Sequence, residues 1–209
     1  MAAAPDKHKG SRRQGRTLAF QVLFGLGFDP QEGEAAVRLA FTRNPAVEEC
    51  ELEDAKNFAS QLVQGVCENL PEIDKVIGKH SDHWKIGRIG KVELAILRLS
   101  LFEILHRSDI PLKVAINEAI ELAKGFGDEN SRSFVNGILD AVARAVDEGR
   151  FGIEKKIDRK PGHKPAQAFD QKPGQMSDRV PGVKPGVNID KAVDEKQTMS
   201  TDTKTRAAK

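Results

Sequence analysis

Apolar residues recur at intervals of three and four along residues 17–150, and no stretch of useful length alternates apolar with polar residues. One example is the series Ala19, Val22, Leu23 and Leu26. This spacing gathers side chains on one face of an α-helix, whereas alternation is typical of a half-buried β-strand. The sequence therefore predicts an all-α fold.

The same pattern, read with the glycine and proline positions, predicts about seven helices. They are expected at residues 11–26, 34–42, 52–70, 71–77, 90–107, 111–124 and 131–146. Gly125 and Gly127 are expected to end the sixth helix, and Ser131 is expected to be the N-cap of the seventh. The expected buried positions of the fifth helix are Val92, Ile96, Leu99 and Leu105.

Residues 151–209 differ from the rest in composition. They contain five of the ten prolines, a Lys-Pro-Gly triplet repeated every twelve residues, and only two aromatic residues. Such a segment buries too little apolar surface to offset the entropy lost on ordering. We therefore expect a flexible N-terminus at 1–10, a helical domain at 11–149 and a disordered basic tail at 150–209.

The formal net charge of +2 conceals an uneven distribution. Residues 1–16 carry five basic residues and one acidic residue, and residues 151–209 carry thirteen basic and eight acidic residues. The intervening part has an excess of seven acidic residues. Basic ends on an acidic body indicate polyanion binding at one end, although they also serve solubility alone.

Several classes of protein are excluded by what the chain lacks. It has no apolar run near the ~18 residues that a membrane helix needs, and Met1 to Arg16 contain no apolar stretch typical of a secretory signal. Two cysteines are too few for a disulfide framework or a zinc site. With no phosphate-binding glycine loop or evident nucleophile, we expect a cytoplasmic protein that is not an enzyme and uses no metal or cofactor.

Two segments have the composition of a nucleic-acid site. Arg12, Arg13 and Arg16 open the first helix, where cations oppose the helix dipole at roughly 0.3–1 kcal/mol each. Their presence there indicates a use for the charge, such as phosphate contact. The second segment contributes cations for phosphates, aromatic rings for stacking and an amide for base edges. Its candidates are Lys124, Phe126, Asn130, Arg132 and Phe134. The alternative for the two phenylalanines is that they anchor the core.

Three runs carry a family resemblance: LRLSLFEIL at 97–105, IPLKVAINEAIELAK at 110–124 and FVNGIL at 134–139. Together with the arginines of the first helix, followed by Ala19, Gln21, Leu23 and Phe24, they resemble the NusB family of transcription antitermination factors. The resemblance implies two small packed helical bundles. It also implies a bacterial factor that binds single-stranded boxA RNA together with NusE, a small-subunit ribosomal protein.

Such a factor promotes transcription of ribosomal RNA operons within RNA polymerase complexes that hold other Nus factors. By position, the resemblance implies that the arginines Arg12, Arg13 and Arg16 bind RNA, that the segment from Lys124 to Phe134 continues this surface, and that Phe24 and Glu93 face NusE. It further implies self-association of some members through the RNA face. The acidic body suits a basic ribosomal protein as a partner.

Two positions depart from the family pattern. Phe24 stands where a tyrosine often occurs, so a hydroxyl contact to NusE would be missing. Asn130 stands where an acidic residue is common, so repulsion of RNA phosphate should be weaker. Two other functions remain as alternatives: the RNA-binding module of a ribosomal RNA cytosine methyltransferase, which would need a Rossmann-like domain after it, and a helical scaffold that binds no RNA.

Overall fold

In the computed structural model, residues 7–81 and 85–152 are described, and all of them lie in the first of two units of the chain, residues 1–169. Over these described ranges the secondary structure consists of eight α-helices and one short 3₁₀ helix, without strands. The all-α prediction is therefore confirmed. The expected tail lies outside the described residues from position 153 onward.

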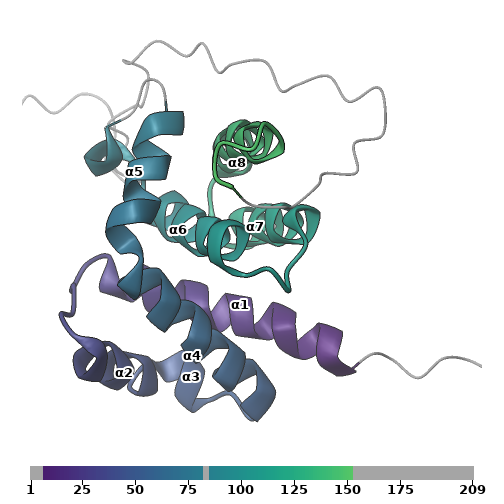
Figure 1. The fold of residues 1–209 in the computed structure, drawn as a ribbon. Coiled ribbons are helices and arrows are strands. Elements are labelled where there is room, and N and C mark those ends of the chain that lie inside the picture. Colours follow the sequence, from purple (N-terminus) through teal and green to yellow (C-terminus); the bar gives the residue numbers. More distant parts are fainter. Residues whose placement is uncertain (1–6, 82–84, 153–209) are drawn as a thin grey trace, which may run out of the picture. The chain divides into compact units, whose positions relative to one another are not determined.

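The first four helices pack together as one bundle, which occupies the lower part of Figure 1. They are α1 (Lys7–Leu26), α2 (Glu34–Thr42), α3 (Pro45–Glu48) and α4 (Glu53–Glu68). The short α3 was not expected from periodicity. It begins at Pro45, and the side chain of Asn44 accepts a hydrogen bond from the Ala46 amide at 3.1 Å. An Asn N-cap followed by proline is a local start signal that periodicity does not detect.

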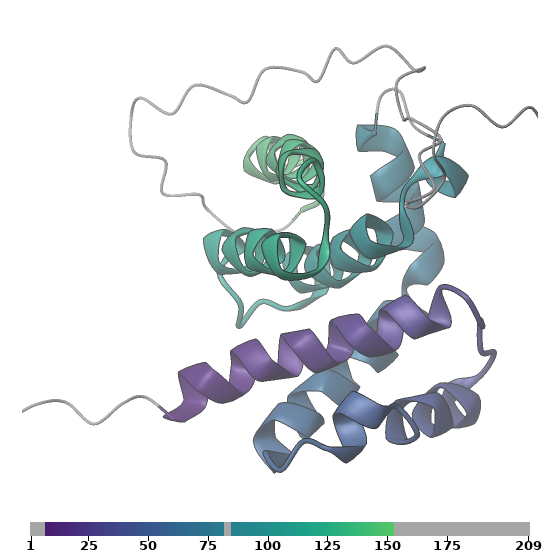
Figure 2. The same ribbon diagram turned by 180° about the vertical axis from the view of Figure 1, so that it is seen from behind.

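The remaining helices form the second bundle, above the first in Figure 1. They are α5 (Leu70–His80), the 3₁₀ turn η1 (Ile86–Arg88), α6 (Lys91–His106), α7 (Leu112–Phe126) and α8 (Ser131–Asp147). Within the first bundle, α1 is the helix that faces the second. Figures 1 and 2 show α4 on one side of α1 and α6 and α7 on the other, and contacts join α1 to all three helices. The expectation of two small bundles is confirmed.

Helix α6 is the centre of the core and is buried on all sides. The single expected stripe was too narrow: Ile96 and Leu99 are buried, whereas Val92 and Leu105 are half-buried. Positions outside that stripe are buried as well, namely Leu94, Ala95, Leu97, Leu101, Phe102 and Ile104. The reason is that α6 packs against α1, α4, α5, α7 and α8 at once, and a helix that is apolar all round is an interior helix.

The contact between α4 and α6 depends on a glycine. A Cβ atom at Gly65 would lie 2.0 Å from Cζ of the buried Phe102 ring. We expect Gly65→Ala to lower the free energy of unfolding by about 1–3 kcal/mol, because the buried ring must move. Urea denaturation measures this change.

A matched control is Gly137→Ala in α8, where a Cβ atom meets nothing within 4 Å. That substitution should stabilise the protein by up to about 1 kcal/mol through helix propensity alone. If both alanine variants were stabilised equally, the close approach of α4 to α6 would not require a glycine at position 65.

Candidate nucleic-acid interface

The three arginines of α1 have different environments. The side chains of Arg12 and Arg13 are 49% and 61% exposed, whereas that of Arg16 is 5% exposed. Arg12 and Arg16 lie one turn apart on the same side of α1, so their different exposure comes from what packs against each turn of the helix. Arg12 and Arg13 are therefore available to a ligand, and Arg16 is held in the interior.

Arg16 forms an ion pair with Glu103 of α6, in which Nε donates to Oε1 at 2.8 Å. Its Nη1 also lies 3.8 Å from Oε2 of Glu118 on α7. Burial raises the pKa of the Glu103 carboxyl, and the guanidinium groups of Arg16 and Arg107 oppose that shift. The two guanidinium groups therefore favour the charged form of Glu103. The ion pair of Arg16 with Glu103 also joins α1 to the second bundle.

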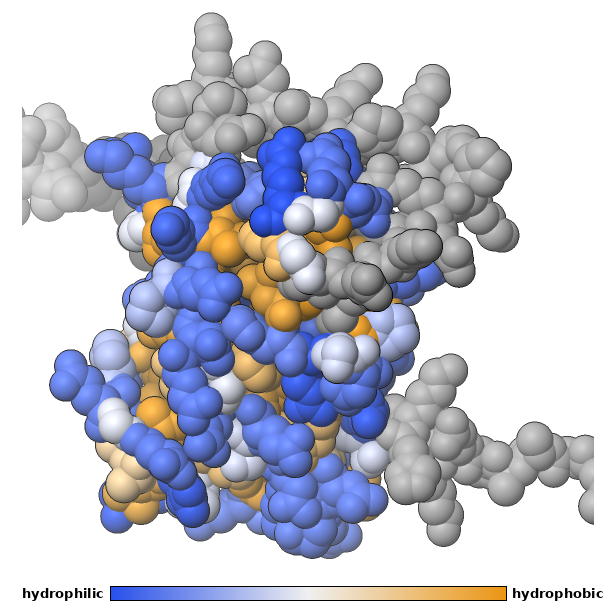
Figure 3. All heavy atoms as spheres, in the orientation of Figure 1, coloured by the Kyte–Doolittle hydropathy of each residue, from blue (hydrophilic) through white to orange (hydrophobic). Residues whose placement is uncertain are grey.

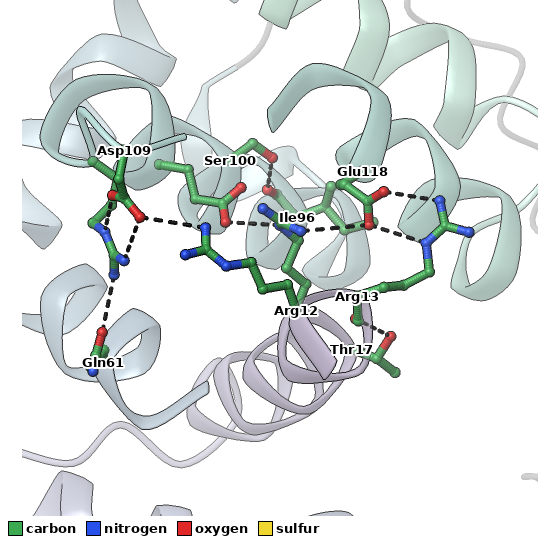
Figure 4. A network of polar contacts seen from close by, with 11 residues as sticks. Arg12, Arg13, Thr17, Gln61, Ile96, Ser100, Asp109 and Glu118 are labelled. Atoms are coloured by element: carbon green, nitrogen blue, oxygen red, sulfur yellow. Dashed lines mark hydrogen bonds and ion pairs between the residues drawn. The ribbon is translucent and has the colours of Figure 1, made fainter. Parts of the chain in front are cut away.

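The exposed arginines are also paired, at the edge of the same network (Figure 4). Arg13 donates from Nε and Nη2 to the two carboxylate oxygens of Glu118, at 3.2 and 2.9 Å. Arg12 lies 3.4 Å from Asp109, which also accepts two hydrogen bonds from Arg107, at 2.8 and 3.1 Å. The hydrogen bond from Arg107 lowers the pKa of the Asp109 carboxyl, and the charges of Arg107 and Arg12 act in the same direction.

An aromatic ring lies under these guanidinium groups. The Cζ atoms of Arg12, Arg16 and Arg107 are 5.3, 5.5 and 5.5 Å from the centroid of Phe58 on α4. Cations within about 6 Å of a ring face are attracted by its quadrupole. A hollow of about 230 Å³ opens beside them, lined by Ser11, Arg12, Asp54, Asn57, Phe58, Gln61 and Arg107. In Figure 3 the surface around the N-terminal half of α1 is strongly hydrophilic, whereas apolar residues gather over the second bundle.

The second candidate segment runs from the end of α7 into α8. Lys124 is exposed and donates to Glu121 at 2.6 Å, and Arg132 is exposed on the first turn of α8. Phe126 is 40% exposed, and its ring centroid lies 4.6 Å from that of Phe20 on α1. Phe134 is half-buried and packs against the core. Both phenylalanines therefore contact the interior, and Phe126 also presents part of its ring to solvent.

The turn between α7 and α8 differs from the prediction. Helix α7 continues through Gly125 to Phe126 and has the expected Gly127 at its C-cap, whereas Asn130 rather than Ser131 occupies the N-cap position of α8. The capping hydrogen bonds come from Asp128, whose Oδ1 accepts from the backbone N–H groups of Asn130 and Ser131 at 2.8 Å each. These bonds replace the expected N-cap because an Asp side chain can bond to the backbone two and three residues later.

Ser131 connects this turn to α6. Its hydroxyl donates to the carboxylate of Glu93 and accepts from the Asp128 amide at 2.8 Å. The same hydroxyl also lies 2.9 Å from Oδ1 of Asp128, and this side-chain contact is the main cause that lowers the pKa of Asp128. Glu93, expected to face a partner protein, is thus engaged with the turn beside Asn130. Phe24 contacts the rings of Phe20 and Phe28, at centroid distances of 6.0 and 5.1 Å.

The sequence did not identify several residues that shape this surface. Glu118 and Glu121 are three residues apart in the sequence, a spacing that is typical of a solvated helix face and does not indicate contacts with α1. Asp109, Arg107 and Phe58 gave no signal, because the contacts that bring them together with Arg12 join residues that are distant in the chain. Phe28 is 65% exposed and has Nζ of Lys91 5.6 Å from its ring centroid.

Within the described ranges, no group of three or more His, Cys, Asp or Glu side chains is arranged to hold a metal ion. None of the helices in that part of the chain has both the length and the apolar character that crossing a membrane requires. At the ends of α1, α7 and α8 the described residues present exposed cations beside the partly exposed ring of Phe126.

Comparison with known proteins gives a consistent result. The NusB family model matches residues 13–144, a range that contains every candidate residue above except Arg12. The transcription antitermination protein NusB of Nitratidesulfovibrio vulgaris (strain DSM 19637 / Miyazaki F) is 47% identical over 154 residues, which cover 68% of this chain and 93% of the relative. The NusB of Geobacter sulfurreducens is 47% identical over 137 residues, covering 66% and 96%.

Two solved structures are similar in fold. NusB of T. maritima is 38% identical with a TM-score of 0.57, and the match covers 64% of this chain and 90% of that one. A chain from a complex of antitermination factors NusB and NusE with double-stranded RNA is 28% identical with a TM-score of 0.58, covering 65% and 98%.

Proposed function

Because this chain belongs to the NusB family, we propose that it is a transcription antitermination factor that binds RNA together with NusE. The observation that carries the proposal is a run of four exposed cations across the ends of α1, α7 and α8: Arg12, Arg13, Lys124 and Arg132. Glu121 links the two halves of this run. Hydrogen bonding from Lys124 lowers the pKa of its carboxyl, and the charges of Arg13 and Arg132 add to that shift.

Each part of this surface suits one feature of RNA. Exposed guanidinium and ammonium groups contact phosphates, which position the RNA without reading its sequence. The exposed part of the Phe126 ring offers a surface for base stacking, and the Asn130 amide offers a donor and an acceptor for a base edge. Arg16 and Phe134 lie below this surface and do not face the RNA. Their packing holds α1 and α8 in place.

The proposed RNA is a boxA-type single strand from ribosomal RNA operons, bound within an RNA polymerase complex that includes other Nus factors in the cytoplasm. Phe24, Glu93 and the neighbouring exposed Phe28 form the proposed NusE-facing surface. Glu93 touches Ser131 of the turn beside Asn130. A partner that contacts Glu93 would therefore also act on the RNA-facing turn.

Two alternatives are less well supported. The matched relatives are antitermination proteins covered over nearly their whole length, so we infer a factor without catalysis rather than the module of a methyltransferase. A scaffold that binds NusE but no RNA would leave the four exposed cations without a use. Self-association through the same surface would hide those cations and should compete with RNA.

The decisive measurement is RNA affinity as a function of salt. Four phosphate contacts to single-stranded RNA predict a slope of log affinity against log salt near −3, since each contact contributes about −0.7. Filter binding or fluorescence anisotropy with a boxA-like single strand, with and without NusE, measures this slope, and a duplex of the same sequence serves as the comparison. NusE binding combined with a slope near zero would support the scaffold instead.

A further inference from the structure

Each exposed arginine of α1 shares its carboxylate with a second, less exposed arginine. Glu118 pairs with the exposed Arg13 at 2.9 Å and lies 3.8 Å from the buried Arg16. Asp109 pairs with Arg12 at 3.4 Å and with Arg107 at 2.8 Å, and the side chain of Arg107 is only 21% exposed. The same three-part arrangement thus occurs twice along the edge of the bundle joint.

Because each carboxylate has two arginine partners, it keeps one of them when the exposed arginine turns to another anion. If Arg13 moves to another anion, Glu118 keeps the charge of Arg16 beside it, and Asp109 likewise keeps its two hydrogen bonds from Arg107. Removing one partner of a buried ion pair is normally costly because a charge is left without compensation. Here the remaining arginine supplies that compensation, so Arg12 and Arg13 can exchange partners at low cost.

We propose that the carboxylates of Glu118 and Asp109 compete with RNA phosphate for Arg13 and Arg12, and that this competition limits the affinity of the site for RNA. This inference rests on the proposed RNA-binding function. In the free protein the carboxylates occupy the arginine N–H groups that a phosphate would use. When RNA binds, the arginines exchange carboxylate for phosphate, and the acidic groups stay paired with Arg16 and Arg107.

The competing interpretation is that the carboxylates pre-organise the arginines for RNA. Geometry favours competition for Arg13, because both of its hydrogen bonds to Glu118 come from the edge of the guanidinium that matches a phosphate or carboxylate in bidentate fashion. A phosphate that used the remaining N–H groups would have to lie close to a like-charged carboxylate. Both routes make the acidic group a hindrance to binding.

The test is Glu118→Gln in the full chain, with affinity measured for a boxA-like single strand and for an unrelated single strand of equal length. We expect binding to both RNAs to tighten by about two- to fivefold, in line with the strength of an exposed ion pair. The matched control is Glu34→Gln, which removes the same charge from an exposed pair with Arg38 on α2. It should leave RNA affinity unchanged.

The same substitution in an Arg13→Ala background separates competition from a general charge effect. If Glu118 acts by holding Arg13, the gain from Glu118→Gln disappears when Arg13 is absent. Weaker or unchanged binding by Glu118→Gln, with an unaltered melting temperature, would overturn the proposal, as would a gain that persists without Arg13. Absence of RNA binding by the unmodified protein would instead reject the proposed function itself.

Discussion

Replacement of Glu103 by alanine is expected to lower the free energy of unfolding by about 3–5 kcal/mol, the usual cost of breaking a buried ion pair from one side. The substitution leaves the Arg16 guanidinium, whose side chain is 5% exposed, without its 2.8 Å partner. Glu118, at 3.8 Å, is too distant to replace that hydrogen bond. Urea denaturation followed by circular dichroism measures the loss.

Two further variants define the cause. Glu34→Ala removes a carboxylate from a largely exposed ion pair on α2 and should change stability by less than about 1 kcal/mol. The double variant Arg16→Met with Glu103→Leu replaces both charges by apolar side chains and should recover most of the loss. If Glu103→Ala cost no more than Glu34→Ala, the pair would have no role in joining α1 to the second bundle.

The double variant Arg12→Ala with Arg13→Ala is expected to weaken RNA binding on the order of 100-fold while the protein stays folded. A hydrogen bond to a charged group contributes about 1.5–3 kcal/mol, and two such contacts together account for this factor. Both side chains are about half exposed or more, and their carboxylate partners Glu118 and Asp109 keep Arg16 and Arg107 beside them, so the substitutions leave no carboxylate without a cation. Fluorescence anisotropy at fixed salt measures affinity, and circular dichroism measures helix content.

The control removes the same charge elsewhere. Arg38 and Arg43 are exposed at the C-terminal part of α2 and just after it, away from the proposed surface. Their double alanine variant should bind RNA within about twofold of the unmodified protein, since screening at physiological salt limits charge effects to about 8 Å. An equal loss in both double variants would mean that net charge rather than the α1 site determines affinity.

The helices were predictable because each is encoded locally. Apolar spacing located α2 at the residues where the structure has it, and it located α4, α5, α6 and α7 to within a few residues. Periodicity failed at α3, which is too short to show a period and starts from a capping signal. In α6 it located the helix but not all of its buried positions, because the helix is buried on every side and has no polar face to limit an apolar stripe.

The candidate site was predictable only in part. The clustering of Arg12, Arg13 and Arg16 in the sequence indicated a cationic helix end, but it did not distinguish the two exposed arginines from the buried one. That distinction depends on carboxylates that lie 87 to 105 residues further along the chain. No local pattern reports such distant pairs, so the division of the arginines into surface and interior comes from the packing of α1 against α6 and α7.

The distance in sequence between Arg16 and Glu103 has a consequence for synthesis. Helix α1 is the first to leave the ribosome, yet its buried arginine cannot form the ion pair with Glu103 until 87 more residues have been added. At about 5–20 residues per second this takes roughly 4–17 s. The first bundle can assemble during that interval, but its joint with the second cannot close. The nascent chain therefore cannot complete its fold until the helices of the second bundle have been made and can pack against the earliest helix.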